Sequence, residues 1–356
     1  MDRREFMKRV GTLGAAGLAL SAVPWLKGCT AAGQEEIRGG RVRFGVIGTG
    51  SRGQYHMRNL LSVPNAGITA LCDNYAHNLD KASAIAPGAK RYDDHRRLLE
   101  DPEVDAVIIA APLHLHYRMA LDAFAAGKHV LCEKPFTLEP SQAEELFALA
   151  RRKSLFLMEM QKVVFLPVVR QIKDLIQKGG FGRITMADFS SSFDAGYNGW
   201  FFDGAKGGGP LYGTAGYSLQ LMQYLLDCYA AEWTGLCTRS QSGVEDQFSL
   251  AVRMENDTLY ANKTSIRTDT IHTGYIYGEK GYIELPDYWK AQKAILHYKD
   301  RETEILEAPC EYELMYEVIH AEQCIRQGLV ESPVMTEEMT VRAVRVLHEI
   351  HKQWNP

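Results

Sequence analysis

The sequence has no block of basic residues. Its 356 residues carry 40 Lys and Arg against 44 Asp and Glu, a formal net charge of −4. Nucleic-acid binding and attachment to an anionic surface both depend on clustered positive charge, so we expect neither. The chain also has no internal repeat and no low-complexity tract, and we expect a globular protein.

Closely spaced cysteine pairs are missing too. The seven cysteines are scattered over the chain, at Cys29, Cys72, Cys132, Cys228, Cys237, Cys310 and Cys324. No spacing matches CxxC or a zinc site, so the sequence predicts no bound metal. The last six cysteines are interpreted as buried thiols, although an exported protein would be free to form disulfides.

A long apolar run is also lacking, because the run over residues 10–23 is too short to cross a bilayer as a stable helix. Arg3 and Arg4 precede it in the pattern of a twin-arginine leader, which exports folded proteins. Leu26-Lys27-Gly28-Cys29 resembles a lipobox, although Lys27 replaces the usual small residue.

We therefore predict a signal over residues 1–29 and a polar tether over residues 30–40, with a periplasmic or cell-envelope location. A lipid on Cys29 would attach the protein to the membrane. An ordinary cleavable signal with a chance cysteine is the alternative.

The rest of the chain is too long for one hydrophobic core. Without residues 1–28 it has 328 residues, and the loss of five basic and two acidic side chains leaves a net charge of −7. This length predicts two domains. Over residues 41–160, apolar strands alternate with amphipathic helices, which indicates a parallel doubly wound sheet of the α/β class, the Rossmann type. Strands are expected at 42–47, 68–72, 106–110, 130–132 and 155–158, and helices at 54–61, 77–85, 94–99, 116–126 and 141–152.

Residues 161–356 have a different pattern, typical of an α+β substrate domain with an open, largely antiparallel or mixed sheet. Strands are expected at 183–190, 245–254, 258–265, 270–278 and 281–285, and helices at 166–178, 313–327 and 336–353. Because these helices are too few to cover both faces of the sheet, we expect a homo-oligomer.

A glycine loop follows the first strand. Gly48 would allow a tight turn, Gly50 would let the backbone approach a pyrophosphate, and Gly53 would pack the helix on the strand. Ser51 and Arg52 lie between them and would also contact the cofactor.

Asp73 ends the second strand, 20 residues after the last of these glycines. Its carboxylate would bind the ribose hydroxyls of a dinucleotide and repel a 2′-phosphate. The expected cofactor is therefore NAD, with NADP less favoured.

A second signal is Glu133-Lys134-Pro135, directly after a predicted strand. A lysine at the carboxyl end of a parallel strand points into the crevice where a nicotinamide would lie. With this turn the chain resembles the Gfo/Idh/MocA oxidoreductase family. The residues that carry the resemblance are Gly48, Gly50, Gly53, Ala111-Pro112 with His116, Ala126-Gly127-Lys128-His129-Val130 and Glu133-Lys134-Pro135.

The resemblance implies a second-domain motif at Gly207-Gly208-Gly209-Pro210-Leu211-Tyr212, followed by a helix. Many members have Asp, His and Asp where this chain has Gly213, Tyr217 and Gln220. Tyr217 and Gln220 are similar to the dimeric dihydrodiol dehydrogenase branch, and glucose-fructose oxidoreductase also has Tyr at the first of these two positions. Gly213 removes a carboxylate and puts ordinary dehydrogenase activity in doubt.

The resemblance also implies the site residues. Lys134 and Tyr217 would be catalytic, with Lys134 and the positive nicotinamide lowering the pKa of the Tyr217 phenol so that it acts as a base. Pro112, His116 and Glu133 would join the glycine loop and Asp73 around the cofactor. An alternative interpretation is that His116 caps the first turn of its own helix.

The sequence offers several candidate residues for binding a sugar. The aromatic residues Tyr197, Trp200, Phe201, Phe202 and Tyr212 suit the faces of a pyranose, but also a core or a dimer face. Glu159, Asp194 and Asp203 are the acidic side chains that would bind sugar hydroxyls, and the sequence does not choose among them.

These patterns predict an exported NAD-dependent oxidoreductase that acts on a sugar or glycoside hydroxyl. One alternative is an enzyme that cleaves glycosides through a keto-sugar and then returns the hydride, but the glycosidase branch of the family lacks the Glu133-Lys134-Pro135 turn. Another is a non-catalytic sugar-binding lipoprotein, for which Gly213 is the support.

Overall fold

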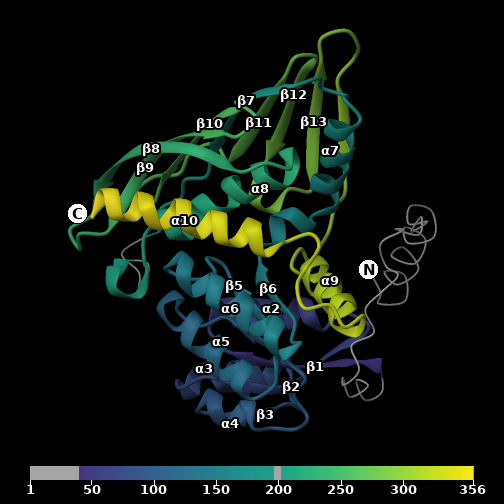
Figure 1. Cartoon of the computed structure of the whole chain (residues 1–356), viewed down its shortest axis with the longest axis vertical. Helices are drawn as coiled ribbons and strands as arrows, with labels where there is room; N and C mark the ends of the chain where they lie inside the picture. Colours follow the sequence, from purple (N-terminus) through teal and green to yellow (C-terminus); the bar gives the residue numbers. More distant parts are fainter. Residues whose placement is uncertain (1–39, 196–201, 356) are drawn as a thin grey trace. The chain divides into compact units, whose positions relative to one another are not determined.

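The computed structural model describes residues 40–195 and 202–355 (Figure 1). The predicted signal, all of the tether except Gly40, and three aromatic residues of the expected sugar site, Tyr197, Trp200 and Phe201, lie outside the described residues. In the described part, no helix has the length and apolar character needed to cross a membrane.

The first sheet is built from six strands that are all parallel. They are β1 (Val42–Ile47), β2 (Ala66–Cys72), β3 (Lys90–Tyr92), β4 (Ala106–Ile109), β5 (His129–Glu133) and β6 (Leu157–Met160). Their order, β3-β2-β1-β4-β5-β6, is that of a doubly wound sheet and confirms the predicted fold class.

Helices α2 (Ser51–Leu60), α3 (Ala76–Ile85), α4 (His95–Leu99), α5 (His116–Ala125) and α6 (Pro140–Lys153) connect these strands. Buried apolar side chains fill a core on each face of the sheet, because strands of a parallel sheet are covered on both sides. The short edge strand β3 was not predicted, since its sequence is Lys-Arg-Tyr and its first two residues are exposed.

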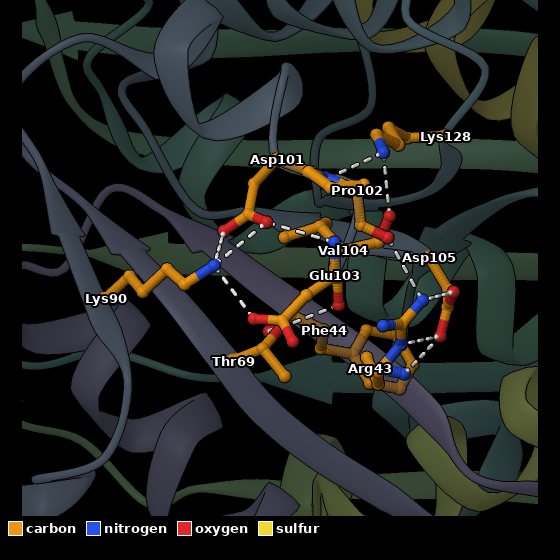
Figure 2. A network of polar contacts seen from close by, with 10 residues as sticks. All are labelled: Arg43, Phe44, Thr69, Lys90, Asp101, Pro102, Glu103, Val104, Asp105 and Lys128. Atoms are coloured by element: carbon orange, nitrogen blue, oxygen red, sulfur yellow. Dashed lines mark hydrogen bonds and ion pairs between the residues drawn. The ribbon is translucent and has the colours of Figure 1, made fainter. Parts of the chain in front are cut away.

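A polar network ties the amino ends of these strands together (Figure 2). Arg43 of β1 pairs with Asp105 at 2.7 Å, and Lys90 of β3 pairs with Asp101 at 3.1 Å. Lys128, just before β5, donates to two carbonyls of the loop before β4 at 2.9 and 2.8 Å. Lys128 of the 126–130 motif thus stabilises the loops at the amino ends of the strands, opposite their carboxyl ends.

The second sheet has eight strands in the order β14-β13-β12-β11-β7-β10-β9-β8. They are β7 (Ile184–Ser190), β8 (Ala230–Arg239), β9 (Glu245–Met254), β10 (Leu259–Ser265), β11 (Thr273–Gly278), β12 (Gly281–Pro286), β13 (Lys293–Tyr298) and β14 (Glu304–Glu307). Neighbours are antiparallel except β7 and β10, so the sheet is mixed, as expected. β8, β13 and β14 were not predicted, and β14 and β8 are the sheet's edge strands.

Helices cover one face of this sheet (Figure 1). They are α7 (Pro167–Gln177), α8 (Gly216–Leu226) and α10 (Glu337–Trp354), while α9 (Met315–Arg326) packs against α2 and β1 of the first sheet. α10 packs both against β8 of the second sheet and against α6, a helix that covers the first sheet. The predicted boundary after residue 160 coincides with the end of β6, and the separate folding of two domains stays a prediction.

The described cysteines are free thiols, as expected. Cys72, Cys132 and Cys324 are buried. The prediction of burial is wrong for Cys228, Cys237 and Cys310, which are partly exposed because they lie in half-covered strands and loops.

Candidate functional site

A cleft of about 1200 Å³ opens at the carboxyl ends of β1, β2, β4 and β5. Among its lining residues are all the predicted cofactor-binding residues except Gly53, namely Gly48, Gly50, Ser51, Arg52, Asp73, Pro112, His116, Glu133 and Lys134. Gly213 and Lys162 complete its far end. In open α/β sheets this is where ligands bind.

The glycine loop has the geometry that a pyrophosphate requires. Gly48 has a φ of +86°, and a Cβ there would lie 2.7 Å from the backbone of Ala110. A Cβ on Gly53 would lie 1.9 Å from the carbonyl oxygen of Gly48, so only glycine lets α2 approach the loop. A Cβ on Gly50 would meet no atom closer than 3.9 Å, which leaves open space for a ligand against this backbone.

Asp73 is held rigidly at the other end of the cleft. Its Oδ2 accepts hydrogen bonds from the Thr49 N–H at 2.8 Å and from Asn78 Nδ2 at 3.1 Å, and its Oδ1 accepts from the Tyr75 N–H at 2.9 Å. Asp93 and Asp94, which sequence reasoning missed, line the same end. These carboxylates disfavour a bound 2′-phosphate, whereas Arg96, which lines the cleft beside Asp94, would attract one.

Glu133 anchors the glycine loop to β5. Its Oε1 accepts a hydrogen bond from His56 Nε2 at 2.6 Å and pairs with Arg52 Nε at 3.4 Å. Burial alone would raise the pKa of Glu133, but Arg52 and His56 hold it well below its usual range. Arg52 is therefore turned toward a carboxylate that stays ionised.

His116 starts α5 and has both ring nitrogens against backbone carbonyls. Nε2 lies 2.8 Å from the Ala111 oxygen, and Nδ1 lies 3.1 Å from the Pro135 oxygen. Burial lowers the pKa of His116. This arrangement ties β4 to the turn after Lys134 and fits a positioning role better than proton transfer.

Lys134 lines the far end of the cleft and lies against Tyr217, which is buried and does not itself line the cleft. In the sequence, 83 positions separate the two residues. The Lys134 Nζ lies 4.3 Å from the centre of the Tyr217 ring and donates to the Gly213 carbonyl oxygen at 2.6 Å. Gly213 belongs to a π-helical turn, Leu211–Ala215, that precedes α8. Such turns often occur at functional sites. The backbone at Gly213 thus orients the lysine.

The surroundings of Tyr217 favour its phenolate. Burial raises the pKa of the phenol, but Lys134, Lys162 and Arg52 together outweigh burial and lower it below its usual value. A lowered pKa brings a tyrosine closer to use as a base near neutral pH.

Gln220 does not replace a carboxylate in the cleft, because it turns inward. Its Nε2 donates to Glu159 Oε2 at 2.6 Å, and its Oε1 accepts from Gln161. Burial raises the pKa of Glu159 to about 7. Glu159, which was one of three expected ligands for sugar hydroxyls, is 2% exposed and belongs to this network instead.

Tyr212 is also buried, with its ring 5.1 Å from that of His351, so it packs in the core of the second half. Asp203 pairs with Lys206 at 2.7 Å. Among the described residues, no group of three His, Cys, Asp or Glu side chains is placed to hold a metal ion.

Three residues that sequence reasoning missed stand beside the predicted ones. Lys162 lines the cleft and pairs with Glu313 at 2.8 Å, and Tyr55 donates to the same carboxylate. The three come from segments far apart in the chain, and none belongs to a motif. Only the fold brings them together.

Comparison with known proteins agrees with this geometry. Residues 42–161 match the family described as "Oxidoreductase family, NAD-binding Rossmann fold", and residues 169–284 match the "GFO/IDH/MocA C-terminal domain". The chain belongs to the Gfo/Idh/MocA family. It is an oxidoreductase with a nicotinamide dinucleotide cofactor, as its sequence predicts.

Among the relatives of this Gfo/Idh/MocA chain are trans-1,2-dihydrobenzene-1,2-diol dehydrogenases. The Mus musculus protein is 25% identical over 326 residues, which cover 87% of this chain and 96% of the relative. The Xenopus tropicalis protein is 26% identical over 289 residues, which cover 78% and 88%.

Solved structures of the same fold include a levoglucosan dehydrogenase in complex with NADH and levoglucosan, with a TM-score of 0.80 and 19% identity over 88% of this chain and 97% of that one. KijD10, a 3-ketoreductase from Actinomadura kijaniata in complex with NADP, has a TM-score of 0.79 and 22% identity over 88% and 97%. At these identities the likeness concerns the fold.

Proposed function

We propose that this protein oxidises a hydroxyl group of a sugar or glycoside, with Tyr217 as the base. The observation that carries the proposal is the contact of Lys134 with the Tyr217 ring at the end of a cleft that begins with the glycine loop. A bound NAD would supply the hydride acceptor at this end.

The residues of the chain handle the proton. Oxidation of an alcohol releases a proton as the hydride leaves, and a base within hydrogen-bond reach accelerates this step. The Tyr217 phenolate would take the proton from the substrate hydroxyl, and Lys134 would hold the phenolate by its charge. The Gly213 carbonyl oxygen accepts a hydrogen bond from the Lys134 ammonium and so fixes its position.

The substrate class is supported by the relatives and neighbours together. The dehydrogenases named for a cyclic diol and for levoglucosan both act, by their names, on ring hydroxyls. A preference for NAD over NADP is supported by Asp73 with Asp93 and Asp94, since a carboxylate cluster repels a 2′-phosphate.

Export by the twin-arginine route, with a lipid on Cys29, is part of the proposal and rests on residues 1–29. Free NAD is scarce outside the cytoplasm, so an exported enzyme has to retain its cofactor and regenerate it at each cycle.

A homo-oligomer through the open face of the second sheet is also proposed, from the apolar residues that this face exposes.

The test starts with protein exported in its native host. After denaturation, the supernatant should contain NAD or NADH in an amount close to one per chain. Adding sugars and glycosides to the intact protein should then raise the absorbance of reduced nicotinamide. Tyr217→Phe serves as the control, because it should keep its cofactor and lose the reduction.

Two results would count against this function. A supernatant without dinucleotide would favour the sugar-binding lipoprotein. Cleavage of a glycoside without accumulation of a keto-sugar would favour the hydride-returning glycoside-cleaving enzyme.

A further inference from the structure

Lys162 is a second lysine at the catalytic end of the cleft. It follows β6 in a short turn, Lys162–Phe165, which packs against α8, the helix of Tyr217. Its side chain is only 7% exposed, yet it lines the same cleft as Lys134 and Gly213. Lysines are seldom buried to this extent unless they are paired, so its partners matter.

Glu313 holds Lys162 in place, and Tyr55 in turn holds Glu313. Its Nζ donates to Glu313 Oε1 at 2.8 Å, and the other oxygen of Glu313 accepts a hydrogen bond from Tyr55. Tyr55 lies on α2, two residues after Gly53, and Glu313 lies just before α9. The Leu314 N–H also donates to Asn59 of α2 at 2.9 Å. The ammonium is therefore held by Glu313, which is itself tied to α2 through Tyr55 and Asn59.

The charges that face Tyr217 come from three elements. Burial raises the pKa of the phenol, while Lys134, Lys162 and Arg52, in this order of strength, lower it, and Glu133 raises it. Arg52 already pairs with Glu133. Near Lys162 lie the titratable groups Glu313, Glu317 and Cys310, and Tyr288 lies near Tyr217.

We propose that Lys162, held by Glu313, is a positioning residue that stabilises the phenolate of Tyr217 together with Lys134. In a partly buried site the field of an ammonium is only weakly screened, so a second cation can act on the phenolate without direct contact with it. The proton of the substrate still goes to the Tyr217 oxygen. This inference rests on the proposed role of Tyr217 as the base.

The titration of Tyr217 tests the inference without any substrate. The protein is labelled with [13Cζ]tyrosine, and the resonance of Tyr217 among its 17 tyrosines is assigned from Tyr217→Phe. Removing an opposite charge near a phenol typically raises its pKa by about one unit or more. Lys162→Met should therefore shift the titration midpoint of Tyr217 upward by about one pH unit, and Lys162→Arg should restore it.

Lys173 provides a matched control. It also pairs with an acid, Asp227, and its Nζ lies 4.2 Å from the centre of another tyrosine ring on α8, Tyr224, but it does not line the cleft. Lys173→Met should leave the midpoint of Tyr217 unchanged. Glu313→Gln removes the carboxylate that offsets Lys162, so it should move the midpoint in the opposite direction, downward.

An unchanged midpoint in Lys162→Met would overturn the inference, and so would an upward shift of equal size in Lys173→Met. If Lys162→Met fails to fold, Glu313→Gln decides, because a midpoint equal to that of the unaltered protein contradicts the role of Lys162. A shifted midpoint without sugar oxidation would reject the proposed function and keep this inference. Sugar oxidation with an unshifted midpoint would keep the proposed function and reject this inference.

Discussion

Among single residues, the reaction depends most on Tyr217 and Lys134. General base catalysis typically contributes a factor of about 10²–10⁴, so we expect Tyr217→Phe to reduce bound NAD more slowly by about this factor. Lys134→Met should lose as much. Because the two residues share one function, the double variant should be little worse than the worse single variant. Single-turnover absorbance of the reduced cofactor measures all three.

The matched control for this prediction lies on the same helix. Tyr224 is also on α8 and also has a lysine over its ring, but that lysine, Lys173, does not line the cleft as Lys134 does. Tyr224→Phe should react as fast as the unaltered protein. If Tyr217→Phe also reacted as fast, another group would have to accept the proton of the substrate hydroxyl. His116, which lines the cleft, would be the next candidate, yet its two nitrogens already face carbonyl oxygens.

Glu245 predicts a pH dependence of stability. It is buried beside the Gly209-Pro210 segment, where it accepts the Leu211 N–H, and burial raises its pKa to about 7. The folded protein then binds this proton more tightly than the unfolded chain does. The resulting stabilisation is present at low pH and is lost as pH rises from about 4.5 to about 7, a loss of at most about 3 kcal/mol.

Glu245→Gln keeps an acceptor for this N–H and cannot ionise. Relative to the unaltered protein, its free energy of unfolding should therefore be similar at pH 5 and higher at pH 8. Denaturant unfolding at the two pH values measures the difference. Glu232→Gln, at an exposed position of β8, should show no such difference. An equal effect of Glu245→Gln at both pH values would mean that Glu245 is ionised in the folded protein throughout.

At the scale of elements, the loop between β1 and α2 separates two uses of glycine. A Cβ at position 53 would collide with the Gly48 carbonyl, whereas a Cβ at position 50 would stand in open space. Gly53→Ala should therefore destabilise the cofactor-free protein by about 1–3 kcal/mol. Gly50→Ala should leave that stability unchanged but abolish retention of NAD, because the backbone must approach the pyrophosphate.

Thermal unfolding of the cofactor-free variants and the NAD content of the purified ones measure these two effects. Equal stability losses in both variants would show that Gly50 is needed for the fold itself. Full NAD content in Gly50→Ala would place the pyrophosphate elsewhere in the cleft.

The elements that could be predicted from the sequence are those with strong periodicity. β1, β2, β4 and β5 are nearly continuous apolar runs, so these strands and their parallel arrangement could be predicted. β6 lies two residues later than predicted, because Leu155 and Phe156 are buried ahead of the strand and extend its apolar run. The π-helical turn at Leu211–Ala215 has no periodic signal, since tertiary contacts decide it.

At the scale of the whole molecule, the site is assembled from residues of both halves of the chain. Lys134 and Tyr217 could be paired from the sequence because each belongs to a family motif. Lys162, Glu313 and Tyr55 could not, because an isolated lysine or glutamate is usually a solvated side chain. Their pairing depends on η3 (Lys162–Phe165), α2 and the segment before α9 meeting at one end of the cleft.

The open face of the second sheet carries a continuous row of apolar and aromatic side chains. Across neighbouring strands, His297 lies beside Tyr282, Tyr282 beside Tyr277, Tyr277 beside Met186, and Met186 beside Leu259. Met186 is 48% exposed and Leu259 is 47% exposed. In the described part of the chain, the helices lie on the other face (Figure 1). Contiguous exposed apolar surface of this kind is typical of an interface.

We expect a second copy of the chain to cover this face. In a symmetric dimer the same patch meets itself, so one substitution places two like charges in the interface. Met186→Glu should therefore yield monomers at micromolar concentration, where the unaltered protein is oligomeric by light scattering. Leu61→Glu, at an exposed apolar residue just after α2, should leave the oligomer intact. A monomeric unaltered protein would reject the interface, and an oligomer that survives Met186→Glu would move it away from this row.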